Sequence, residues 1–424
     1  MKRIRLKDFR CFNDYEMTFR PGINLLIGDN ASGKTTILKA LQIAASSFFA
    51  GFNDEYTRFT GIGNDDFSRF FAGDKLLPVK PIDIQFDMGN YGGLFLSRSG
   101  KKNRTSIKGI TAWKQEGQNL LTAIANGERK ALPLFAAFST EDIHSSRRLS
   151  MKPFKDYFLP VSFGYYESLQ GNGLFDYWIK RLLVLCEGGE GATEIACVRK
   201  AIIDALAADG CGIMQEVIVR PVQGIVYFKL ADDRLVSAED LSDGYKRLVN
   251  IIMDLAFRCA LLNGQIYHEK ACSETKGCVL IDEIDQHLHP SLQAVVLKGL
   301  QHAFPAMQFV VTTHAPMVMT SLRNDKCNIV YHLKYAKGAY SHEEIHTYGM
   351  DASTIIETFM HQQARDARVA EDLKKLFRLI DESHIDEARK LLEEMRQTFE
   401  NTIPELSEAE AMLTFYDDLY DEEL

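Results

Sequence analysis

An eight-residue stretch near the amino terminus places the tightest constraint on the fold. Gly28 to Thr35 reads G-D-N-A-S-G-K-T. It follows the apolar run 23–27, which predicts a buried strand, and precedes 36–45, where apolar residues recur at helical spacing. A glycine-rich loop that enters a helix N-terminus offers unpaired backbone N–H groups to an anion. The pattern G-x-x-x-x-G-K-T therefore predicts a phosphate-binding loop.

The residues of this loop have separate expected roles. We expect Lys34 to reach the β- and γ-phosphates of a nucleotide, and the hydroxyl of Thr35 to ligate Mg²⁺. Asn30, Gly33 and Thr36 complete the nucleotide contacts that the loop predicts. The alternative is a glycine-rich turn that only mimics the pattern, and the flanking strand and helix disfavour it.

Composition places the chain among ordinary globular proteins. Its 424 residues are 46% hydrophobic and 25% charged, which suggests two or three domains. No apolar run approaches the ~18 residues of a membrane-spanning helix. The basic start, Met1–Arg5, is not followed by the apolar segment of a signal peptide. The eight cysteines show no pairing pattern. We therefore expect reduced thiols, a cytoplasmic protein and no membrane partner.

Charge is unevenly distributed along the chain. The net charge is −9, but residues 401–424 hold eight acidic residues and no Lys or Arg, so residues 1–400 carry about −1. The acidic average therefore does not exclude a nucleic-acid surface. Basic clusters at 98–108 and 147–155 are candidate DNA phosphate contacts, with solvated loops as the alternative. The acidic tail either docks a partner or keeps the chain soluble.

Three further segments point to the chemistry of a triphosphate. The apolar run 279–281 ends in Asp282 and Glu283, where Asp282 can hold Mg²⁺ through water and Glu283 can polarise an attacking water. An acidic turn at a strand end is the alternative. Leu241-Ser242-Asp243-Gly244 precedes a strong helical pattern, and Ser242 is also a natural helix cap. A later strand leads into Thr312-Thr313-His314, at the same edge of an open α/β sheet.

In this order and spacing, the phosphate loop, L-S-x-G, the Asp-Glu pair and T-H resemble the ATP-binding-cassette (ABC) ATPases. The likeness is to the soluble branch that contains RecF and the structural-maintenance-of-chromosomes proteins. It implies an ABC-type P-loop ATPase head of the α/β class, with a mixed central sheet and flanking helices. It also implies a homodimer, or a higher even-numbered oligomer, that sandwiches two ATP molecules.

The same resemblance implies residue roles. Glu283 would be the general base and His314 the γ-phosphate switch. Ser242 and Gly244 would be the signature residues that act in trans. Asp285 would be the D-loop carboxylate, and Arg10 the N-terminal basic contact. Asp243 and Tyr245 depart from the transporter signature. No Q-loop glutamine is evident, and Ser139–Asp142 occupies its expected place. The insertion at about 165–215 is short and helical rather than a long coiled coil.

A narrower resemblance lies elsewhere in the chain. Thr347–Ser353, Asp386–Arg389 and Gly164–Leu169 are similar to segments of compact ATPases in bacterial anti-phage systems, namely Septu PtuA and retron-linked relatives. Such ATPases work with a separate HNH-type nuclease. The resemblance implies an ATP-driven switch that controls a nuclease effector. The alternatives are a RecF-like repair ATPase and an ATP-binding scaffold with little turnover.

The domain expectation is a head over residues 1–350 and a C-terminal helical extension over 351–424, with helices predicted at 364–380 and 385–399. One further pattern, His342-Glu343-Glu344-Ile345-His346, fits the zinc motif H-E-x-x-H. That motif requires a helix, whereas the residues around this pattern favour a strand. In a strand, the two His side chains would lie about 13 Å apart.

Overall fold

Five parallel strands and one antiparallel edge strand form the central sheet of the computed structural model, which describes residues 1–72, 75–140, 149–171, 174–189, 191–360, 362–363, 365–399 and 402–421. The strand order is β15-β14-β3-β13-β12-β8. Only β15 runs antiparallel to its neighbour. The bounds are β3 (Ile23–Gly28), β8 (Leu134–Phe138), β12 (Gly277–Ile281), β13 (Met307–Thr312), β14 (Ile329–Ala336) and β15 (Ala339–Ile345).

The strands at the centre of this sheet are buried on both faces. Every residue of β13 is buried, and so are Ile23 to Ile27 of β3. Continuous burial is typical of parallel strands that helices cover on both faces. The predicted class, a mixed central sheet with flanking helices, is confirmed.

A second, antiparallel sheet lies beside the first. Its order is β2-β1-β6-β7, with bounds β1 (Arg3–Phe9), β2 (Phe12–Thr18), β6 (Ile82–Met88) and β7 (Tyr91–Arg98). Alternate residues of β6 are buried, as the period of two in its sequence predicts. Helix α1 (Lys34–Ser46) contacts β6 as well as β3, β12 and β13 of the central sheet. The helix that follows the phosphate loop is therefore held between the two sheets.

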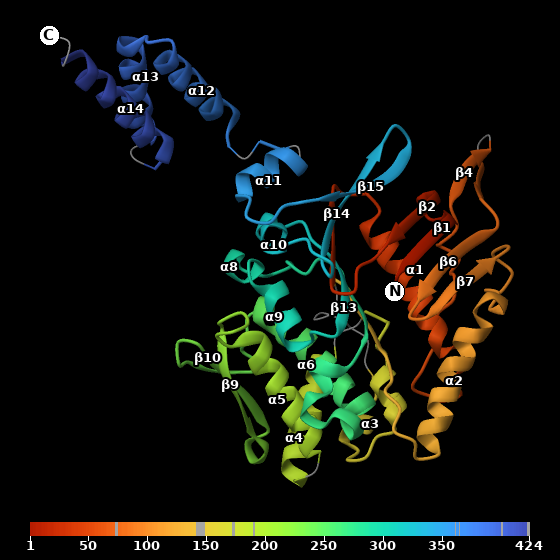
Figure 1. Cartoon of the computed structure of the whole chain (residues 1–424). Helices are drawn as coiled ribbons and strands as arrows, with labels where there is room; N and C mark the ends of the chain where they lie inside the picture. The colour runs from red at the N-terminus through yellow and green to blue at the C-terminus, as the bar shows by residue number, and fades with distance from the viewer. Residues whose placement is uncertain are drawn as a thin grey trace. The chain divides into compact units, whose positions relative to one another are not determined.

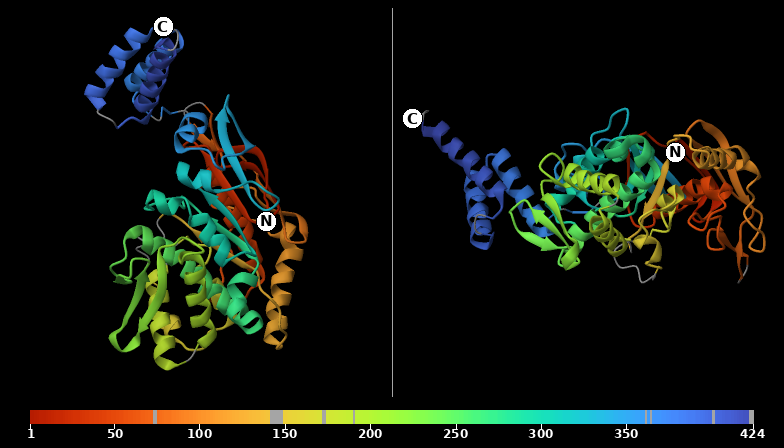
Figure 2. Two further views of the ribbon diagram at one scale, coloured as in Figure 1. Left: turned by 60° about the vertical axis from the view of Figure 1, so that its left-hand side comes forward. Right: turned by 90° about the horizontal axis from the view of Figure 1, so that it is seen from below.

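Helices cover the side of the central sheet that faces away from the second sheet (Figures 1 and 2). The longest is α6 (Asp243–Tyr267), and α5 (Ala192–Leu206) packs along it. The remaining elements of this part are α2 (Thr111–Ala125), α3 (Lys152–Lys155), α4 (Phe175–Gly188), α7 (Ala271–Glu274), α8 (Pro290–Gln293), α9 (Val296–Ala303), α10 (Pro316–Ser321), the strands β4 (Arg69–Ala72), β5 (Lys75–Pro78), β9 (Met214–Arg220), β10 (Ile225–Leu230) and β11 (Leu235–Ser237), and the 3-10 turns η1 (Ser47–Gly51), η2 (Lys108–Ile110), η3 (Val161–Tyr165), η4 (Pro221–Gln223) and η5 (His268–Lys270).

A buried ion pair fixes the short insertion to α6. Asp254 and Arg258 are 3% and 1% exposed, and Arg258 Nε donates to Asp254 Oδ2 at 2.5 Å. The indole of Trp178 donates to the same carboxylate at 2.6 Å. Arg258 also donates to the carbonyls of Gly164 and Tyr166, each at 2.9 Å. One carboxylate and one guanidinium therefore hold α4, α6 and the 164–166 turn together.

The chain divides into two compact units, Met1–Ile355 and Ile356–Leu424. Helix α11 (Ala352–Phe359) spans the division. The second unit is built from α12 (Ala367–Asp381), α13 (Ile385–Phe399) and α14 (Pro404–Asp421). The predicted pair of helices is confirmed in α12 and α13.

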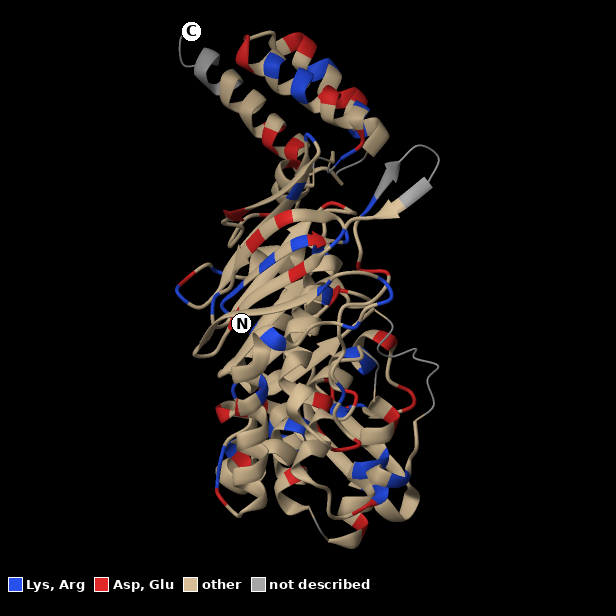
Figure 3. Ribbon diagram, turned by 90° about the vertical axis from the view of Figure 1, so that its right-hand side faces the viewer, with Lys and Arg blue, Asp and Glu red and all other residues tan. Residues whose placement is uncertain are grey.

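The third helix of this bundle, α14, was not predicted, because its sequence reads as an acidic tail. Its acidic residues instead pair with arginines: Glu405 with Arg365 at 2.7 Å, and Glu410 with Arg396. Leu406, Ala409 and Leu413 of α14 are buried in the core of the bundle. Figure 3 shows acidic and basic residues on the helices of this bundle, and the basic residues lie outside α14, whose sequence has no Lys or Arg. Among the described helices, none combines the length and apolar character that crossing a membrane requires.

We predict that Asp254→Ala lowers the free energy of unfolding of the first unit by about 3–5 kcal/mol, because it leaves the buried Arg258 guanidinium without its counter-charge. Both tryptophans, Trp113 and Trp178, lie in this unit, so their fluorescence in a urea titration reports its unfolding. The exposed Asp209, changed to Ala, is the matched control. Equal stability of the two variants would contradict the importance of the ion pair.

Candidate active site

Five segments far apart in the sequence meet in one pocket at the carboxyl ends of β3, β12 and β13. The pocket has a volume of about 330 Å³. It is called the phosphate-loop pocket below. Its lining residues are Cys11, Asn30, Ala31, Ser32, Gly33, Lys34, Thr35, Thr36, Asp282, Glu283, His314 and Tyr340. The structure therefore brings together the predicted loop residues, the acidic pair and the histidine.

Two glycines shape the loop because no other residue fits their positions. The φ of Gly28 is +143°, and a Cβ there would lie 2.3 Å from the Leu333 carbonyl oxygen. The φ of Gly33 is +96°, and a Cβ there would meet the Phe12 ring at 2.5 Å. Real Cβ atoms essentially never come this close to another heavy atom, so a side chain at either position would clash. The loop is therefore seated directly on β14 and on the first residue of β2.

Lys34 opens α1 and is 6% exposed. Its ammonium donates to the carbonyl oxygens of Gly28 at 2.7 Å and Asp29 at 3.0 Å. Burial lowers the pKa of Lys34, and the carboxylates of Asp282, Asp29 and Glu283 oppose that shift. The side chain is thus curled within the loop, where an anion bound to the backbone N–H groups would meet it.

Thr312, at the end of β13, organises the acidic pair. Its hydroxyl donates to Asp282 Oδ1 at 2.6 Å and accepts a hydrogen bond from the Glu283 backbone N–H at 2.7 Å. The other oxygen of Asp282 accepts from the Thr35 hydroxyl at 3.2 Å. In the sequence, Thr312 stood out only as part of the segment Thr312-Thr313-His314, with no role of its own. The hydroxyl of Thr35 and the carboxylate of Asp282 are hard oxygen donors, and this chemistry suits Mg²⁺.

The backbone at Glu283 adopts an unusual conformation. Its φ is +47°, in the left-handed region that non-glycine residues rarely occupy. The neighbouring backbone is held on two sides: the N–H of Ile284 donates to Thr312 O at 3.1 Å, and Arg247 donates to Asp282 O at 2.8 Å. Such strain persists only where the surroundings determine it, and it is common at active sites. Here it accompanies a Glu283 side chain that lines the phosphate-loop pocket.

Asp285 joins the acidic segment to the histidine segment. Its Oδ1 accepts from the Thr313 hydroxyl at 2.5 Å and from the His314 backbone N–H at 3.3 Å. Movement of the 282–285 segment would therefore be transmitted to His314, which lines the pocket.

The predicted signature residues lie at the N-terminus of α6. Ser242 is its N-cap, and its Oγ accepts from Tyr245 N at 3.5 Å. Gly244 packs against the 287–288 backbone, where a Cβ would lie 2.4 Å from His287 O. Neither Ser242 nor Gly244 is among the described residues that line the pocket. Their predicted role concerns a second copy of the chain and stays a prediction.

Arg10 is also absent from the described lining of the pocket. Its Nε donates to the buried carboxylate of Asp66 at 2.8 Å. The adjacent Cys11 lines the pocket instead, with its Sγ 3.8 Å from the Thr36 hydroxyl. Tyr340, on β15, was likewise missed, because nothing in the local sequence links it to a loop 300 residues away.

Some of the other sequence candidates have structural explanations, and others fall outside the described residues. Of the expected Q-loop segment, Glu141 and Asp142 lie outside them, and the Ser139 hydroxyl donates to Gly171 O at 2.7 Å. In the basic clusters, Arg147 and Arg148 also lie outside them. Arg98 donates to the carbonyls of Ile62, Lys101 and Asn103 and so organises its own loop.

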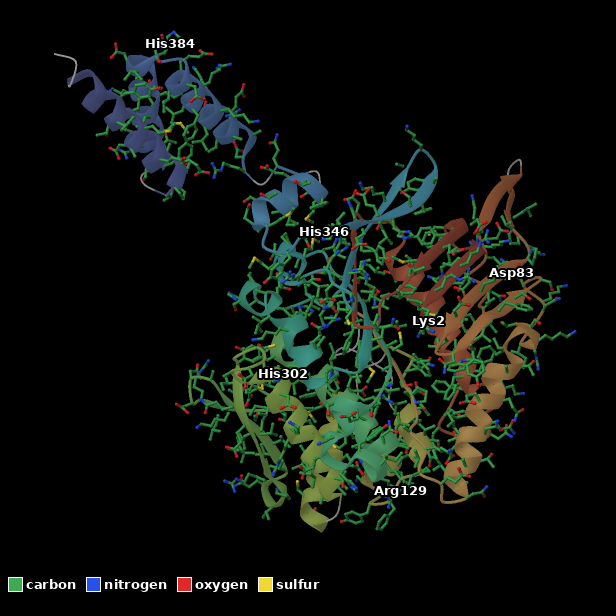
Figure 4. All side chains as sticks on the ribbon, viewed as in Figure 1. Lys2, Asp83, Arg129, His302, His346 and His384 are labelled. Carbon is green, nitrogen blue, oxygen red and sulfur yellow. The ribbon has the colours of Figure 1, made fainter. Side chains whose placement is uncertain are left out.

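The H-E-x-x-H pattern lies on a strand, as predicted. His342 belongs to β15 and His346 follows its end (Figure 4). In an extended segment the two His side chains lie about 13 Å apart, which is too far for them to bind one zinc ion. Within the part of the chain that the structure describes, no group of three or more His, Cys, Asp or Glu residues could hold a metal ion.

Comparisons with known proteins identify relatives of this chain. The "Retron Vc95 probable ATPase" of Vibrio cholerae is 37% identical over 100 residues, which cover 24% of this chain and 19% of that protein. The "Septu protein PtuA" of Bacillus mycoides is 23% identical over 333 residues, which cover 76% of this chain and 39% of that protein. The chain thus spans well under two thirds of the length of these relatives. The predicted likeness to Septu PtuA and retron-linked ATPases is confirmed.

A solved structure of an Smc head bound to the C-winged-helix domain of ScpA matches 81% of this chain and 98% of its own, at 17% identity and a TM-score of 0.47. That score is too low to carry an argument. A family model, by contrast, matches residues 23–320, from β3 through α10. Because that range holds the loop, the acidic pair and the histidine, the chain belongs to the family described as "AAA domain, putative AbiEii toxin, Type IV TA system".

Proposed function

We propose that this protein binds ATP with Mg²⁺ in the phosphate-loop pocket and hydrolyses it to ADP and phosphate. The observation that carries the proposal is the meeting of Lys34, Thr35, Asp282, Glu283 and His314 in one pocket at the carboxyl edge of the sheet. Ligands gather at this edge in open α/β folds.

Each side chain then has a chemical task. The N-terminus of α1 and the Lys34 ammonium bind the β- and γ-phosphates. Thr35 and Asp282 would hold Mg²⁺, which would polarise the terminal phosphate when bound. Glu283 accepts a proton from the attacking water. His314 contacts the γ-phosphate. The hydrogen bond from its backbone N–H to the Asp285 carboxylate couples that contact to the neighbouring loop.

Among the described residues that line the pocket, Ser242 and Gly244, which the family resemblance implies at the γ-phosphate, are absent. Ser242 is exposed at the N-terminus of α6, where the helix dipole favours an anion. A second copy of the chain would bring its Ser242 and Gly244 to the γ-phosphate. We therefore propose a homodimer, or a higher even-numbered oligomer, that closes around two ATP molecules.

The likeness to Septu PtuA and a retron ATPase supports a role in anti-phage defence. We propose that closure around ATP and its release on hydrolysis switch a separate effector, an HNH-type nuclease, in the cytoplasm. DNA is the proposed trigger. ATP turnover measured with and without duplex DNA tests that trigger, and an unchanged rate would contradict it.

We predict that Glu283→Gln lowers kcat by about 10²–10⁴-fold, because it removes the general base, while ATP binding is kept. The variant should elute as an ATP-dependent dimer in size-exclusion chromatography with light scattering. Lys34→Ala, which removes the phosphate contact, should bind no ATP and stay monomeric. Wild-type turnover by Glu283→Gln would refute the assignment of the base.

A mixing experiment tests the role of the signature in trans. Lys34→Ala and Ser242→Arg should each be inactive alone, because one lacks its own loop and the other its signature. An equal mixture should regain turnover, up to about a quarter of wild type, because a mixed pair joins the intact loop of the Ser242→Arg chain to the intact signature of the Lys34→Ala chain in one composite site. A mixture as inactive as its components would show that each site is complete within one chain.

Thr312→Val tests the hydroxyl that organises the acidic pair. The change keeps the side-chain shape but leaves Asp282 Oδ1 and the Glu283 N–H without this partner. We predict that the Mg²⁺ concentration for half-maximal turnover rises by about 10–100-fold. Thr312→Ser, which keeps the hydroxyl, should stay near wild type. A wild-type Mg²⁺ dependence for Thr312→Val would exclude this role.

A further inference from the structure

Some residues that line the phosphate-loop pocket have no assigned role in binding or hydrolysing the phosphates. Cys11, Thr36 and Tyr340 line one side of the pocket, whereas Asp282, Glu283 and His314 line the side where hydrolysis is proposed. The two sides are joined by the loop and the start of α1. A triphosphate held at Lys34 and Thr35 leaves room past Thr36 for the rest of a nucleotide. Cys11 marks that direction, because its Sγ lies 3.8 Å from the Thr36 hydroxyl.

Tyr340 is an aromatic ring held firmly at this side of the pocket. Its ring lies 5.0 Å from that of Phe12 in an edge-to-face arrangement, and 4.5 Å from that of Tyr335. Tyr335 and Tyr340 are directly paired across the β14–β15 hairpin. Phe12 in turn contacts the phosphate loop at Gly33. The contact with Phe12 therefore fixes Tyr340 relative to the loop itself.

The phenol of Tyr340 stays neutral at physiological pH. Its burial is the main cause that raises its pKa to about 12, and the nearby Cys11 adds to the shift. The ring presents a polarisable face and no charge. That chemistry suits contact with a flat heterocycle better than contact with a phosphate.

We propose that the Tyr340 ring is the stacking platform for the nucleobase of the bound nucleotide. The inference rests on the proposed function and adds the base to it. Every base has a π-face, so a stacking contact tolerates different bases. The stacking contact therefore does not select one base over another, and the pocket binds GTP within a few-fold of ATP.

The experiment separates the base from the phosphates. Binding of ATP, GTP and inorganic tripolyphosphate, each with Mg²⁺, is measured by calorimetry for the full chain. Tyr340→Ala should weaken ATP and GTP binding by about tenfold or more, the range of a base-stacking contact. Tripolyphosphate binding should not change. Tyr340→Trp should keep wild-type affinity for both nucleotides, because it keeps an aromatic face.

Tyr335→Ala is the matched control, because Tyr335 is paired with Tyr340, is 58% exposed and is outside the described lining of the pocket. It should leave all three affinities within about threefold of wild type, because it takes no part in the stack. Wild-type ATP affinity in Tyr340→Ala would overturn the inference. So would an equal loss of tripolyphosphate binding, or an equal loss of ATP binding in Tyr335→Ala, since either would mean that the hairpin only supports the loop. Failure of the wild-type chain to bind ATP would instead overturn the proposed function, and this inference with it.

Discussion

The hydroxyl of Thr312 is the contact on which the geometry of the site depends. It donates to the carboxylate of Asp282 and accepts from the backbone N–H of Glu283. One small side chain thus orients the proposed metal ligand and fixes the backbone of the proposed base. Both of its bonds cross from β13 to the end of β12, and this is possible because these neighbouring strands are parallel and in register. The chemistry of the pocket therefore follows from strand order.

The phosphate loop depends on a similar close fit. Gly28 and Gly33 adopt conformations that L side chains rarely allow, and each lies against another part of the chain where a Cβ would clash. The two contacts are with β14, near the end of the head, and with Phe12, near its start. The loop is thus shaped by strands from both ends of the first unit, and this explains how Cys11 and Tyr340 reach the same pocket. The nucleotide side of the pocket is assembled by tertiary contacts rather than by one motif.

Local sequence predicted the parts of the site that are short-range. The strand–loop–helix unit at 23–45, the acidic strand end and the Thr-His pair each carry their chemistry within a few residues, and the structure brings all three together. Thr312, Cys11 and Tyr340 could not be predicted in this way. Their positions follow from which strands become neighbours, and a single sequence does not encode strand order in a local pattern.

Two other differences have physical causes. The sequence of helix α14 resembles an acidic tail, because it has many acidic residues and no basic ones. In the structure, Glu405 and Glu410 pair with arginines. Arg10 is expected at the nucleotide, and this stays a prediction; in the structure its guanidinium donates to the buried Asp66, 56 residues further along the chain. A buried carboxylate competes strongly for a nearby cation, because leaving either charge unpaired is costly.

The central claim is that the phosphate-loop pocket is half of an ATP site that a second copy completes. A structure of Glu283→Gln with ATP and Mg²⁺ tests it most directly. The account predicts the triphosphate on the α1 N-terminus and Lys34, Mg²⁺ between Thr35 and Asp282, and Ser242 and Gly244 of a second copy at the γ-phosphate. A nucleotide bound in an isolated chain, with its γ-phosphate enclosed by that chain alone, would contradict the account.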